Sequence, residues 1–361
     1  MGPVADADVV VIGGGPVGLA TALYAVRAGL VPVLLEPRAA PIDKACGEGL
    51  MPGAVAALGR LGAPVTGRPF LGIRYVDGAR SVEARFRGGP GLGVRRTELH
   101  AALAAAAERA GVEVVPRAMS ALTQDPTGVR VDLDGAGPSS GVRSGPSASV
   151  RGRFVVAADG LHSPTRRLLG LDVPPRGVRR FGLRRHFRVG PWTDLVEVHW
   201  SPAGEAYVTP VADDEVGVAL LGSGRGSWQD RLQDFPALRE RLAGAEPTST
   251  VLGAGPLRQR SRSRRAGRVV LVGDAGGYVD ALTGEGLAVG LAQARAAATA
   301  LAAGRPQLYP RAAARVSLPS AALTSGLLAS TRTAPGRRAV LTAAHRAPWL
   351  FDQAVNALAH D

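Results

Sequence analysis

The 361-residue sequence has a single lysine, a single asparagine and a single cysteine, and these scarcities exclude several kinds of site. Because Cys46 is the only cysteine, neither an internal disulfide framework nor a zinc or iron–sulfur site with several cysteines can form. The six histidines are dispersed, with no close pair at the spacing of metal ligands. The sequence therefore predicts no metal site.

Acidic residues are also in the minority, with 30 Asp plus Glu against 43 Lys plus Arg and a formal net charge of +13. Such a balance can indicate a nucleic-acid or membrane-surface partner. All the basic residues except Lys44 are arginines, however, and they are scattered along a chain that is rich in alanine and glycine. This pattern favours the codon bias of a GC-rich genome, so we expect no nucleic-acid partner.

Long uncharged runs are rare, and the longest one near the start does not read as a membrane helix. Residues 9–26 carry no charge, but Gly-Gly-Gly-Pro at 13–16 interrupts them. No basic region precedes an apolar stretch, so a signal peptide is not expected. We expect a cytoplasmic protein without a transmembrane segment, for which peripheral membrane contact stays open. The 46% of hydrophobic and 20% of charged residues exclude a disordered or fibrous chain.

The pattern of apolar residues indicates an α/β protein with a later antiparallel part. Residues 9–12, 16–29 and 31–35 read as a strand, a helix and a parallel strand, the length of a crossover unit. A change to alternating and aromatic residues indicates antiparallel strands within 179–221. The other expected elements are helices at 95–110, 228–242 (interrupted at Pro236) and 285–302, strands at 112–115, 129–133, 154–157 and 269–272, a loop at 135–149, and C-terminal helices separated by Pro319, Pro335 and Pro348.

The strongest local motif is the glycine-rich turn at residues 13–18, Gly-Gly-Gly-Pro-Val-Gly, between the first strand and the first helix. It matches G-x-G-x-x-G. In this pattern Gly13 permits the tight turn, Gly15 lets a pyrophosphate approach the backbone, and Gly18 lets helix and strand pack closely. The motif predicts a dinucleotide site, with a glycine-rich connector as the alternative.

Carboxylates stand at the ends of three expected strands. Glu36 ends the second strand, 18 residues after the last glycine of the turn, where a carboxylate can bind a ribose diol. Asp159 and the pair Gly273–Asp274 follow two further buried strands. A carboxylate at the end of such a strand faces the ligand crevice and can accept hydrogen bonds from sugar or ribityl hydroxyls.

Two helix starts are expected to present free N–H groups to an anion. Pro16 lies in the first turn of the first helix, and Gly284 and Gly286 open the helix at 285–302. The second of these helix starts would stabilise the negative charge that a reduced flavin carries at N1.

In this order the motifs resemble the FAD-dependent monooxygenases of the para-hydroxybenzoate hydroxylase superfamily, from residue 8 to about 305. Residues 269–290 look closest to the geranylgeranyl reductase and flavin-dependent halogenase branches. The aromatic hydroxylases usually have a histidine after Gly-Asp-Ala-Ala and a proline further on, whereas this chain has Gly276-Gly277 and Ala281. The resemblance implies FAD as the cofactor and NAD(P)H as a transient reductant.

The resemblance also extends to residues 44–50, Lys-Ala-Cys-Gly-Glu-Gly-Leu, because reductases of that branch carry Cys-x-Gly in a loop close to the flavin. Lys44 would supply a positive charge and Cys46 a polarizable or weakly acidic group. Together with Glu48 they are the candidate catalytic residues, and Cys46 is also a candidate cofactor contact. The alternative is a loop fixed by glycines, with Cys46 as a small apolar filler.

Further site residues rest on the same resemblance. Arg96 matches the arginine that opens a helix and contacts the cofactor in this superfamily, and Arg38 would reach the ribose or pyrophosphate. Tyr207 and Pro210 partly match the aromatic-and-proline substrate segment of the reductases. The histidines at 100, 162, 186 and 199 have no partner at the spacing of a catalytic dyad and are expected to be structural. The arginines at 258–268 are expected to be solvated, with attraction of a nicotinamide cofactor's phosphates as the alternative.

The expected architecture is a Rossmann-like FAD-binding domain of the glutathione-reductase type, with an inserted antiparallel-sheet substrate domain and C-terminal helices. The FAD-binding domain would comprise residues 1–74, 93–175 and 251–305, the substrate domain 75–92 and 176–250, and the C-terminal helical segment 306–361. The C-terminal helices would close the substrate pocket or form a dimer contact, so a monomer and a homodimer are both compatible.

The favoured function is an NAD(P)H-dependent monooxygenase that hydroxylates or epoxidises an apolar or phenolic small molecule. In this chemistry the cofactor performs the difficult step, while the protein excludes water and orients the substrate. The closest alternative is a flavin-dependent reductase of isoprenoid double bonds, with Cys46 near the reaction. A halogenase is disfavoured because the chain has no W-x-W-x-I-P segment. A non-catalytic binding protein on the same fold is the alternative from another class.

Overall fold

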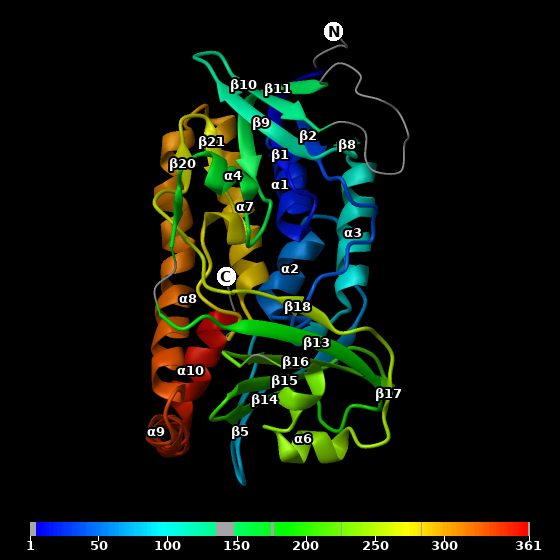
Figure 1. The fold of residues 1–361 in the computed structure, drawn as a ribbon, viewed down its shortest axis with the longest axis vertical. Coiled ribbons are helices and arrows are strands. Elements are labelled where there is room, and N and C mark those ends of the chain that lie inside the picture. Colours follow the sequence, from blue (N-terminus) through cyan, green and yellow to red (C-terminus); the bar gives the residue numbers. More distant parts are fainter. Residues whose placement is uncertain (1–4, 135–147, 175–176, 225, 283, 360–361) are drawn as a thin grey trace.

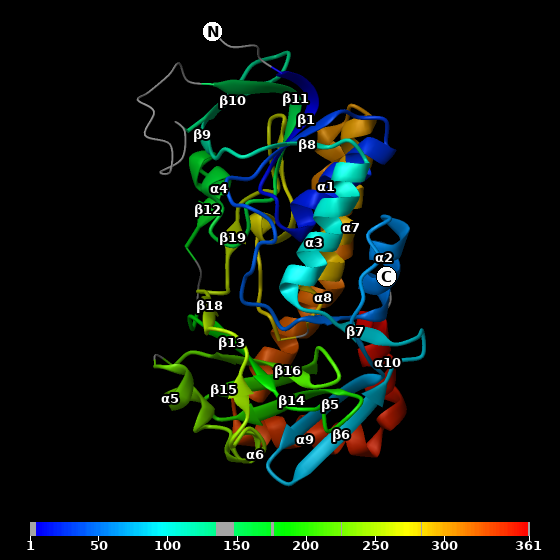
Figure 2. The same ribbon diagram turned by 90° about the vertical axis from the view of Figure 1, so that its right-hand side faces the viewer.

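The computed structural model describes residues 5–134, 148–174, 177–224, 226–282 and 284–359, so most of the loop expected at 135–149 lies outside the described residues. Figure 1 shows two bodies along the long axis, a parallel sheet with its helices at one end and an antiparallel sheet at the other. The first of the three C-terminal helices runs beside both bodies, and the last two lie beside the antiparallel sheet (Figures 1 and 2).

The first sheet has the central order β20-β21-β11-β1-β2-β8. Five consecutive strands, from β21 to the edge strand β8, are parallel, as runs of β-branched residues with no polar face predict. They are β1 (Ala5–Ile12), β2 (Pro32–Leu35), β8 (Glu113–Val115), β11 (Ser149–Ala157) and β21 (Val269–Leu271). The antiparallel additions are β20 (Arg265–Ala266) at the edge, and β9 (Met119–Gln124) with β10 (Val129–Leu133), of which β10 pairs with β11.

Both faces of the first sheet are covered, and alternate residues of β1 divide between them. Val9 and Val11 pack with the helix-side core, while Val10 and Ile12 pack with residues of the β9–β10 hairpin side. The covering helices are α1 (Pro16–Arg27), α3 (Arg96–Arg109) and α7 (Gly286–Ala302). The expected Rossmann-like architecture is thereby confirmed.

The second sheet has the order β17-β13-β16-β15-β14-β5-β6, with β18 also paired to β13. It is antiparallel except for the parallel pair of β14 and β5, where two distant segments of the chain meet. Its strands are β5 (Gly72–Asp77), β6 (Arg80–Arg85), β13 (Phe181–Arg188), β14 (Val196–Ser201), β15 (Gly204–Pro210), β16 (Glu215–Gly222), β17 (Glu246–Pro247) and β18 (Leu252–Ala254).

The two faces of this second sheet have different neighbours. Val208, Val218 and Leu220 pack with α5 (Trp228–Leu232) and α6 (Pro236–Arg241), whose break lies at Pro236 as expected. On the opposite face, Tyr75 and Trp200 share a core with the C-terminal helices. This opposite face is the one that meets the cavity described below.

The C-terminal helices are α8 (Tyr309–Thr331), α9 (Ala334–Arg346) and α10 (Pro348–Ala359), after the short 3-10 turn η2 (Pro306–Leu308). Pro335 and Pro348 lie in first turns, as expected, but Pro319 does not separate two helices. The α8 helix continues through Pro319. The expectation of a break there was wrong, because neighbouring turns and packing against α7 and α9 hold the helix together.

Short elements join the two bodies. A three-stranded sheet consists of β3 (Gly49–Leu50), β7 (Gly91–Gly93) and β4 (Arg68–Phe70). β3 ends the 44–50 loop, and α2 (Pro52–Arg60) follows it in the chain. The remaining elements are α4 (Pro164–Leu168), β12 (Asp172–Val173) paired with β19 (Arg260–Ser261), and the 3-10 turn η1 (Gly273–Gly276). The proposed domain boundary at 74/75 falls inside β5, and β18, which lies beyond 251, pairs with the substrate sheet.

Candidate functional site: a cofactor and substrate cavity

A cavity of about 680 Å³ lies between the two sheets. The carboxyl ends of β1, β2, β11 and β21 and the loops after them form one end, where α/β folds bind ligands. The face of the second sheet forms the other end. We call these the Rossmann end and the sheet end.

The glycine turn at 13–18 has the geometry that its spacing predicts. Gly13 has φ of +103°, and a Cβ there would lie 2.7 Å from Ala158 O. Gly18 packs so closely that a Cβ would overlap Gly13 O, whereas a Cβ on Gly15 would meet nothing within 4 Å. Gly15 and Pro16 therefore face open cavity, while Gly18 is a packing residue behind it.

Glu36 is held by a complete set of hydrogen bonds. Its Oε2 accepts from Gly14 N (2.8 Å) and Arg38 Nη2 (2.9 Å), and its Oε1 accepts from Arg38 N (3.0 Å) and Nε (2.8 Å). Burial raises the pKa of Glu36, but the bonds from Arg38 and Gly14 outweigh it and hold the pKa below its ordinary value. Because a carboxylate offers about four acceptor sites, a ribose diol would bind after the exposed Arg38 side chain moves aside.

Two buried polar atoms on the Rossmann-end wall have no partner among the described residues: Arg96 Nε and Asp159 Oδ1. Asp159 uses its other oxygen to accept from Thr165 N (2.9 Å). Buried polar atoms are almost always hydrogen-bonded, so these two fit a ligand with both acceptor and donor groups. A nucleotide cofactor has both.

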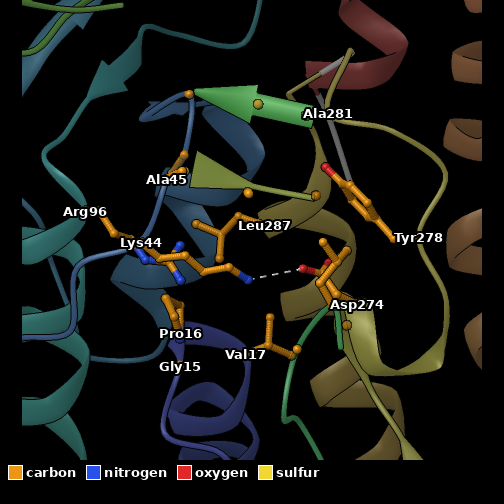
Figure 3. Close-up of a pocket in the computed structure, with 18 of the residues that line it drawn as sticks. Gly15, Pro16, Val17, Lys44, Ala45, Arg96, Asp274, Tyr278, Ala281 and Leu287 are labelled. Atoms are coloured by element: carbon orange, nitrogen blue, oxygen red, sulfur yellow. Dashed lines mark ion pairs between the residues drawn. The ribbon is translucent and has the colours of Figure 1, made fainter. Parts of the chain in front are cut away.

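Lys44 and Asp274 face each other across the cavity at 3.9 Å, as Figure 3 shows. Asp274 lies in η1, and the preceding Gly273, with φ of +58°, donates its N–H to Gln293 Oε1 (2.8 Å). The only lysine thus reaches from the 44–50 loop to η1. A ligand that lies along the wall near Gly15 and Pro16 would meet this lysine.

The start of α7 completes the Rossmann end. Gly284, with φ of +70°, and Gly286, the first residue of α7, both line the cavity, while Thr283 lies outside the described residues. A Cβ on Gly286 would lie 3.4 Å from the ring of Tyr278. The first turn of α7 therefore points free N–H groups toward the cavity, the arrangement that favours an anionic group.

The 44–50 loop joins the two ends of the cavity. Cys46 lines the wall, and its Sγ accepts a weak bond from Glu48 N (3.4 Å). Glu48 has a positive φ of 60° and a buried carboxylate. Thr209 of β15 donates to Gly47 O (2.8 Å), which ties the loop to the second sheet.

The sheet end is mainly apolar. Tyr207 lines it, and its hydroxyl donates to Leu282 O (2.5 Å), while burial raises the pKa of Tyr207 well above its ordinary value. Pro210, the other substrate candidate, does not line the cavity; its carbonyl oxygen packs against Gly93. The apolar wall consists of Met51, Phe70, Ile73, Val196, Val198, Ala219 and Leu221.

The sequence motifs did not predict several residues that support the site. Buried His100 of α3 bonds through Nε2 to Gly14 O (2.9 Å) and so supports the glycine turn. Buried Arg166 donates to Ala275 O (3.1 Å) and Leu161 O (3.0 Å), which joins the segment after β11 to η1. His186 bonds to Glu48. Of these residues, only Arg166 could have been suspected from the sequence, since it lies shortly after the strand-end Asp159.

Residues 6–305 match the model of the FAD binding domain family. The chain belongs to this family. It is 29% identical over 323 residues to menaquinone reductase of Mycolicibacterium smegmatis, covering 82% of this chain and 77% of that protein. It is 28% identical over 312 residues to digeranylgeranylglycerophospholipid reductase 2 of Methanopyrus kandleri, covering 80% and 75%.

The fold is shared with p-nitrophenol 4-monooxygenase PnpA from Pseudomonas putida, with a TM-score of 0.79, 21% identity and coverage of 99% of this chain and 95% of that one. As a member of the FAD binding domain family with these relatives, the protein is a FAD-dependent oxidoreductase. The expected resemblance to FAD-dependent monooxygenases and to the geranylgeranyl reductase branch is thereby confirmed.

Two further observations concern the part of the chain that the structure describes. None of its helices is long and apolar enough to cross a bilayer. Within the described residues, no three His, Cys, Asp or Glu side chains lie close enough together to hold a metal ion.

Proposed function

We propose that the protein is a FAD-dependent reductase that saturates a double bond in an apolar, isoprenoid-like chain. The observation that carries this proposal is the sheet end of the cavity, whose wall is apolar and whose hydroxyls at Tyr207 and Thr209 already donate to backbone carbonyls. Such a wall favours an unsaturated hydrocarbon over a molecule with several polar groups. Two reductases of isoprenoid-containing molecules are relatives over about four-fifths of the chain, which supports the same substrate class.

The Rossmann end would hold FAD. Gly13, Gly15, Pro16 and Gly18 would form the pyrophosphate turn, Glu36 and Arg38 would meet the ribose, and the buried orphan atoms of Arg96 and Asp159 would find partners. Gly273, Asp274, Gly284 and Gly286 would lie near the flavin, with Cys46 on the opposite wall. Reduced FAD would supply a hydride, while the protein positions the double bond and excludes water.

NAD(P)H is the reductant we propose, and an arginine strip beside the cavity supports it. Arg258, Arg260 and Arg262 are exposed and form no ion pair with a described carboxylate. The intervening Gln259 points inward, where it accepts from Arg166 (2.9 Å), so alternation places the three arginines on the outer side. Leu257, directly before the strip, lines the cavity.

A second candidate function is hydroxylation or epoxidation of a phenolic or apolar molecule. It is favoured by Tyr75, whose buried ring lines the sheet end and whose hydroxyl has no hydrogen-bond partner among the described residues. This hydroxyl offers one polar contact, which would suit a phenol. Burial raises the pKa of Tyr75, so the group stays a neutral donor.

The two candidates differ in the mass of the product. FAD-loaded protein is reduced with dithionite and mixed with a polyprenyl menaquinone dispersed in detergent, once without oxygen and once with it. A product of the oxygen-free reaction that stays two mass units heavier after its quinone ring has been reoxidised in air supports the reductase, because dithionite alone adds two hydrogens only to the ring. A product sixteen units heavier, formed only with oxygen, would overturn it in favour of the monooxygenase.

The matched control fills the sheet end and leaves the Rossmann end intact. Ala219→Phe places a ring in the apolar wall, so we expect FAD to remain bound while conversion of the menaquinone falls at least tenfold. Equal conversion by the variant and the unaltered protein would show that the double bond does not bind at the sheet end.

A further inference from the structure

A buried hydrogen-bonded chain runs from the cavity wall to a half-buried hydroxyl beside β13, in the segment between β17 and β18. Glu48 lines the cavity, its Oε2 lies 2.5 Å from His186 Nε2, and His186 Nδ1 lies 2.8 Å from Ser249 Oγ. We propose that these three residues, the proton relay, carry a proton from solvent to the cofactor cavity. The inference rests on the FAD-dependent activity and not on which of the two candidate reactions occurs.

The hydrogen bonds of His186 define the direction of the relay. Arg184 Nη1 lies 3.1 Å from His186 Nδ1, and a guanidinium can only donate. Nδ1 must therefore accept, so the neutral ring carries its proton on Nε2 and donates it to the Glu48 carboxylate. Ser249 Oγ, which accepts from His186 N (3.0 Å), lies 2.8 Å from Nδ1, so its hydroxyl shares the single lone pair of Nδ1 with Arg184 and is placed to pass its own proton there.

Both inner members of the relay are sealed from solvent. Glu48 is 3% exposed and His186 is 0% exposed, whereas Ser249 is half-buried. The route through the ring is therefore a continuous path between the cavity wall and the protein surface that needs no water inside the sheet. Gly217 of β16 makes room for it, because a Cβ there would lie 3.0 Å from Glu48 Oε2.

The charged groups around the relay keep it in place. Arg184 bonds to Asp43, its Nε lies 3.9 Å from Glu48 Oε1, and that same oxygen accepts from Arg96 N (2.9 Å). From the neighbouring strand, Glu215 faces His186 and is bound by Arg95 (2.7 Å). These contacts hold Glu48 in a backbone conformation that non-glycine residues rarely adopt, a strain that is typical of functional positions.

Reactions of a reduced flavin consume a proton. In the saturation of a double bond, one carbon receives the hydride with both electrons, and the other carbon receives a proton. His186 Nε2 would first pass its proton to the Glu48 carboxylate while Nδ1 takes the Ser249 hydroxyl proton. Glu48 would then give the proton to that carbon, solvent would reprotonate Ser249, and return of the ring proton from Nδ1 to Nε2 would restore the starting tautomer. Oxidation of the reduced cofactor by molecular oxygen to hydrogen peroxide also takes up one proton, and it requires no organic substrate.

This second reaction provides the test, because it proceeds whether or not the menaquinone assay succeeds. FAD-loaded protein is reduced without oxygen and mixed with aerated buffer, and the return of the oxidised flavin absorbance is followed in H₂O and D₂O. We expect Glu48→Gln and His186→Gln to slow reoxidation at least tenfold and to enlarge the solvent isotope effect. His199→Gln is the matched control, a buried histidine bonded to Glu197 (3.1 Å) on the adjoining part of the sheet, and it should reoxidise as the unaltered protein does.

Ser249→Val tests the relay where no contact with the cofactor is involved. It removes the outer hydroxyl and blocks a replacing water, so the rate should fall while the FAD content stays unchanged. Loss of the hydrogen bond from His186 N should lower the melting temperature but leave the protein folded at the temperature of the assay. In ¹⁵N NMR spectra of the histidine-labelled protein without FAD, His186 should show a protonated Nε2 and an unprotonated Nδ1. Unchanged reoxidation rates and isotope effects in Ser249→Val and Glu48→Gln, or the opposite tautomer, would overturn the relay.

Discussion

At the scale of single residues, the glycines of the 13–18 turn perform different physical tasks although the motif treats them alike. Gly18 meets the backbone of Gly13, whereas Gly15 borders open cavity. One position is therefore constrained by the fold and the other by whatever enters the cavity. A pair of alanine substitutions separates these two constraints.

Gly15→Ala should leave the fold intact, because its φ of −66° suits alanine and the added Cβ meets nothing within 4 Å. The methyl group would occupy the space that a pyrophosphate needs, so the Kd for FAD should rise at least about tenfold, roughly 1.4 kcal/mol. Gly18→Ala should lower the free energy of unfolding by about 2–3 kcal/mol through overpacking. Titration with FAD and urea unfolding measure both, and a stable Gly18→Ala protein would contradict the close packing.

Glu285, at the N-cap of α7, makes the stability dependent on pH. Burial raises the pKa of its carboxyl to about 7, against an ordinary value of 4.5, and Oε1 has no partner among the described residues. The protonated form is favoured in the folded state. The stabilisation of the folded state by protonated Glu285 is fully present below about pH 4.5 and is lost as the pH rises through about 7.

Glu285→Gln should therefore stabilise the FAD-free protein at pH 8 but change little at pH 4.5. The shift from 4.5 to about 7 corresponds to a difference on the order of 3 kcal/mol, at about 1.4 kcal/mol for each pKa unit. Urea unfolding of both proteins across this pH range measures the difference. A constant offset between the two curves would mean that Glu285 does not titrate in this window.

At the scale of elements, local patterns predicted most of the secondary structure. The apolar run at 9–12, the glycine stop after α1 and the break at Pro236 all act within a few residues, so a single sequence reveals them. Pro319 shows where this fails. A proline breaks an isolated helix, but in α8 packing against neighbouring helices compensates for the lost hydrogen bond.

Pro319→Ala tests how much α8 loses through its proline. Residue 319 is exposed, so the alanine adds a backbone hydrogen bond without disturbing a core. The free energy of unfolding should rise by about 1–3 kcal/mol, up to the cost of proline within a helix. Thermal unfolding provides the measurement, and Ala321→Gly, two residues along the same helix, should shift the melting temperature in the opposite direction. A lower melting temperature for Pro319→Ala would show that the proline stabilises α8 instead of weakening it.

At the scale of the whole molecule, the candidate site was predictable in its local motifs but not in its long-range pairs. Gly13, Glu36, Asp159 and Asp274 reach one cavity because the carboxyl ends of parallel strands meet at one edge. Glu48 and His186 are 138 residues apart, and no spacing rule connects them. Their pairing follows from the packing of the 44–50 loop on the second sheet, which depends on the assembled fold.

At this scale the structure also shows where arginines that contribute to the net charge of +13 lie relative to the cavity. Most of the arginines that the structure describes near the site are paired or bonded to backbone oxygens, as Arg38, Arg166 and Arg184 are. The strip of Arg258, Arg260 and Arg262 differs, since it lies beside the cavity without a described carboxylate partner. Alternate residues of an extended segment point to the same side, so the long side chains of these three arginines can converge on the phosphates of one dinucleotide.

Replacing all three strip arginines with serine should raise the Kd for NADPH at least about tenfold, because exposed cations attract phosphates through a field that salt screens. The rate of FAD reduction is measured against NADPH concentration at low and high salt, with dithionite as a reductant that needs no such site. In the unaltered protein the affinity for NADPH should fall as salt rises, and in the variant it should change little. Serine at Arg311, Arg315 and Arg332, exposed arginines of the C-terminal helices, removes the same charge elsewhere and should have no comparable effect. If both triple variants weaken NADPH equally, net charge alone attracts the reductant; if neither does, NADPH reaches the flavin by another face.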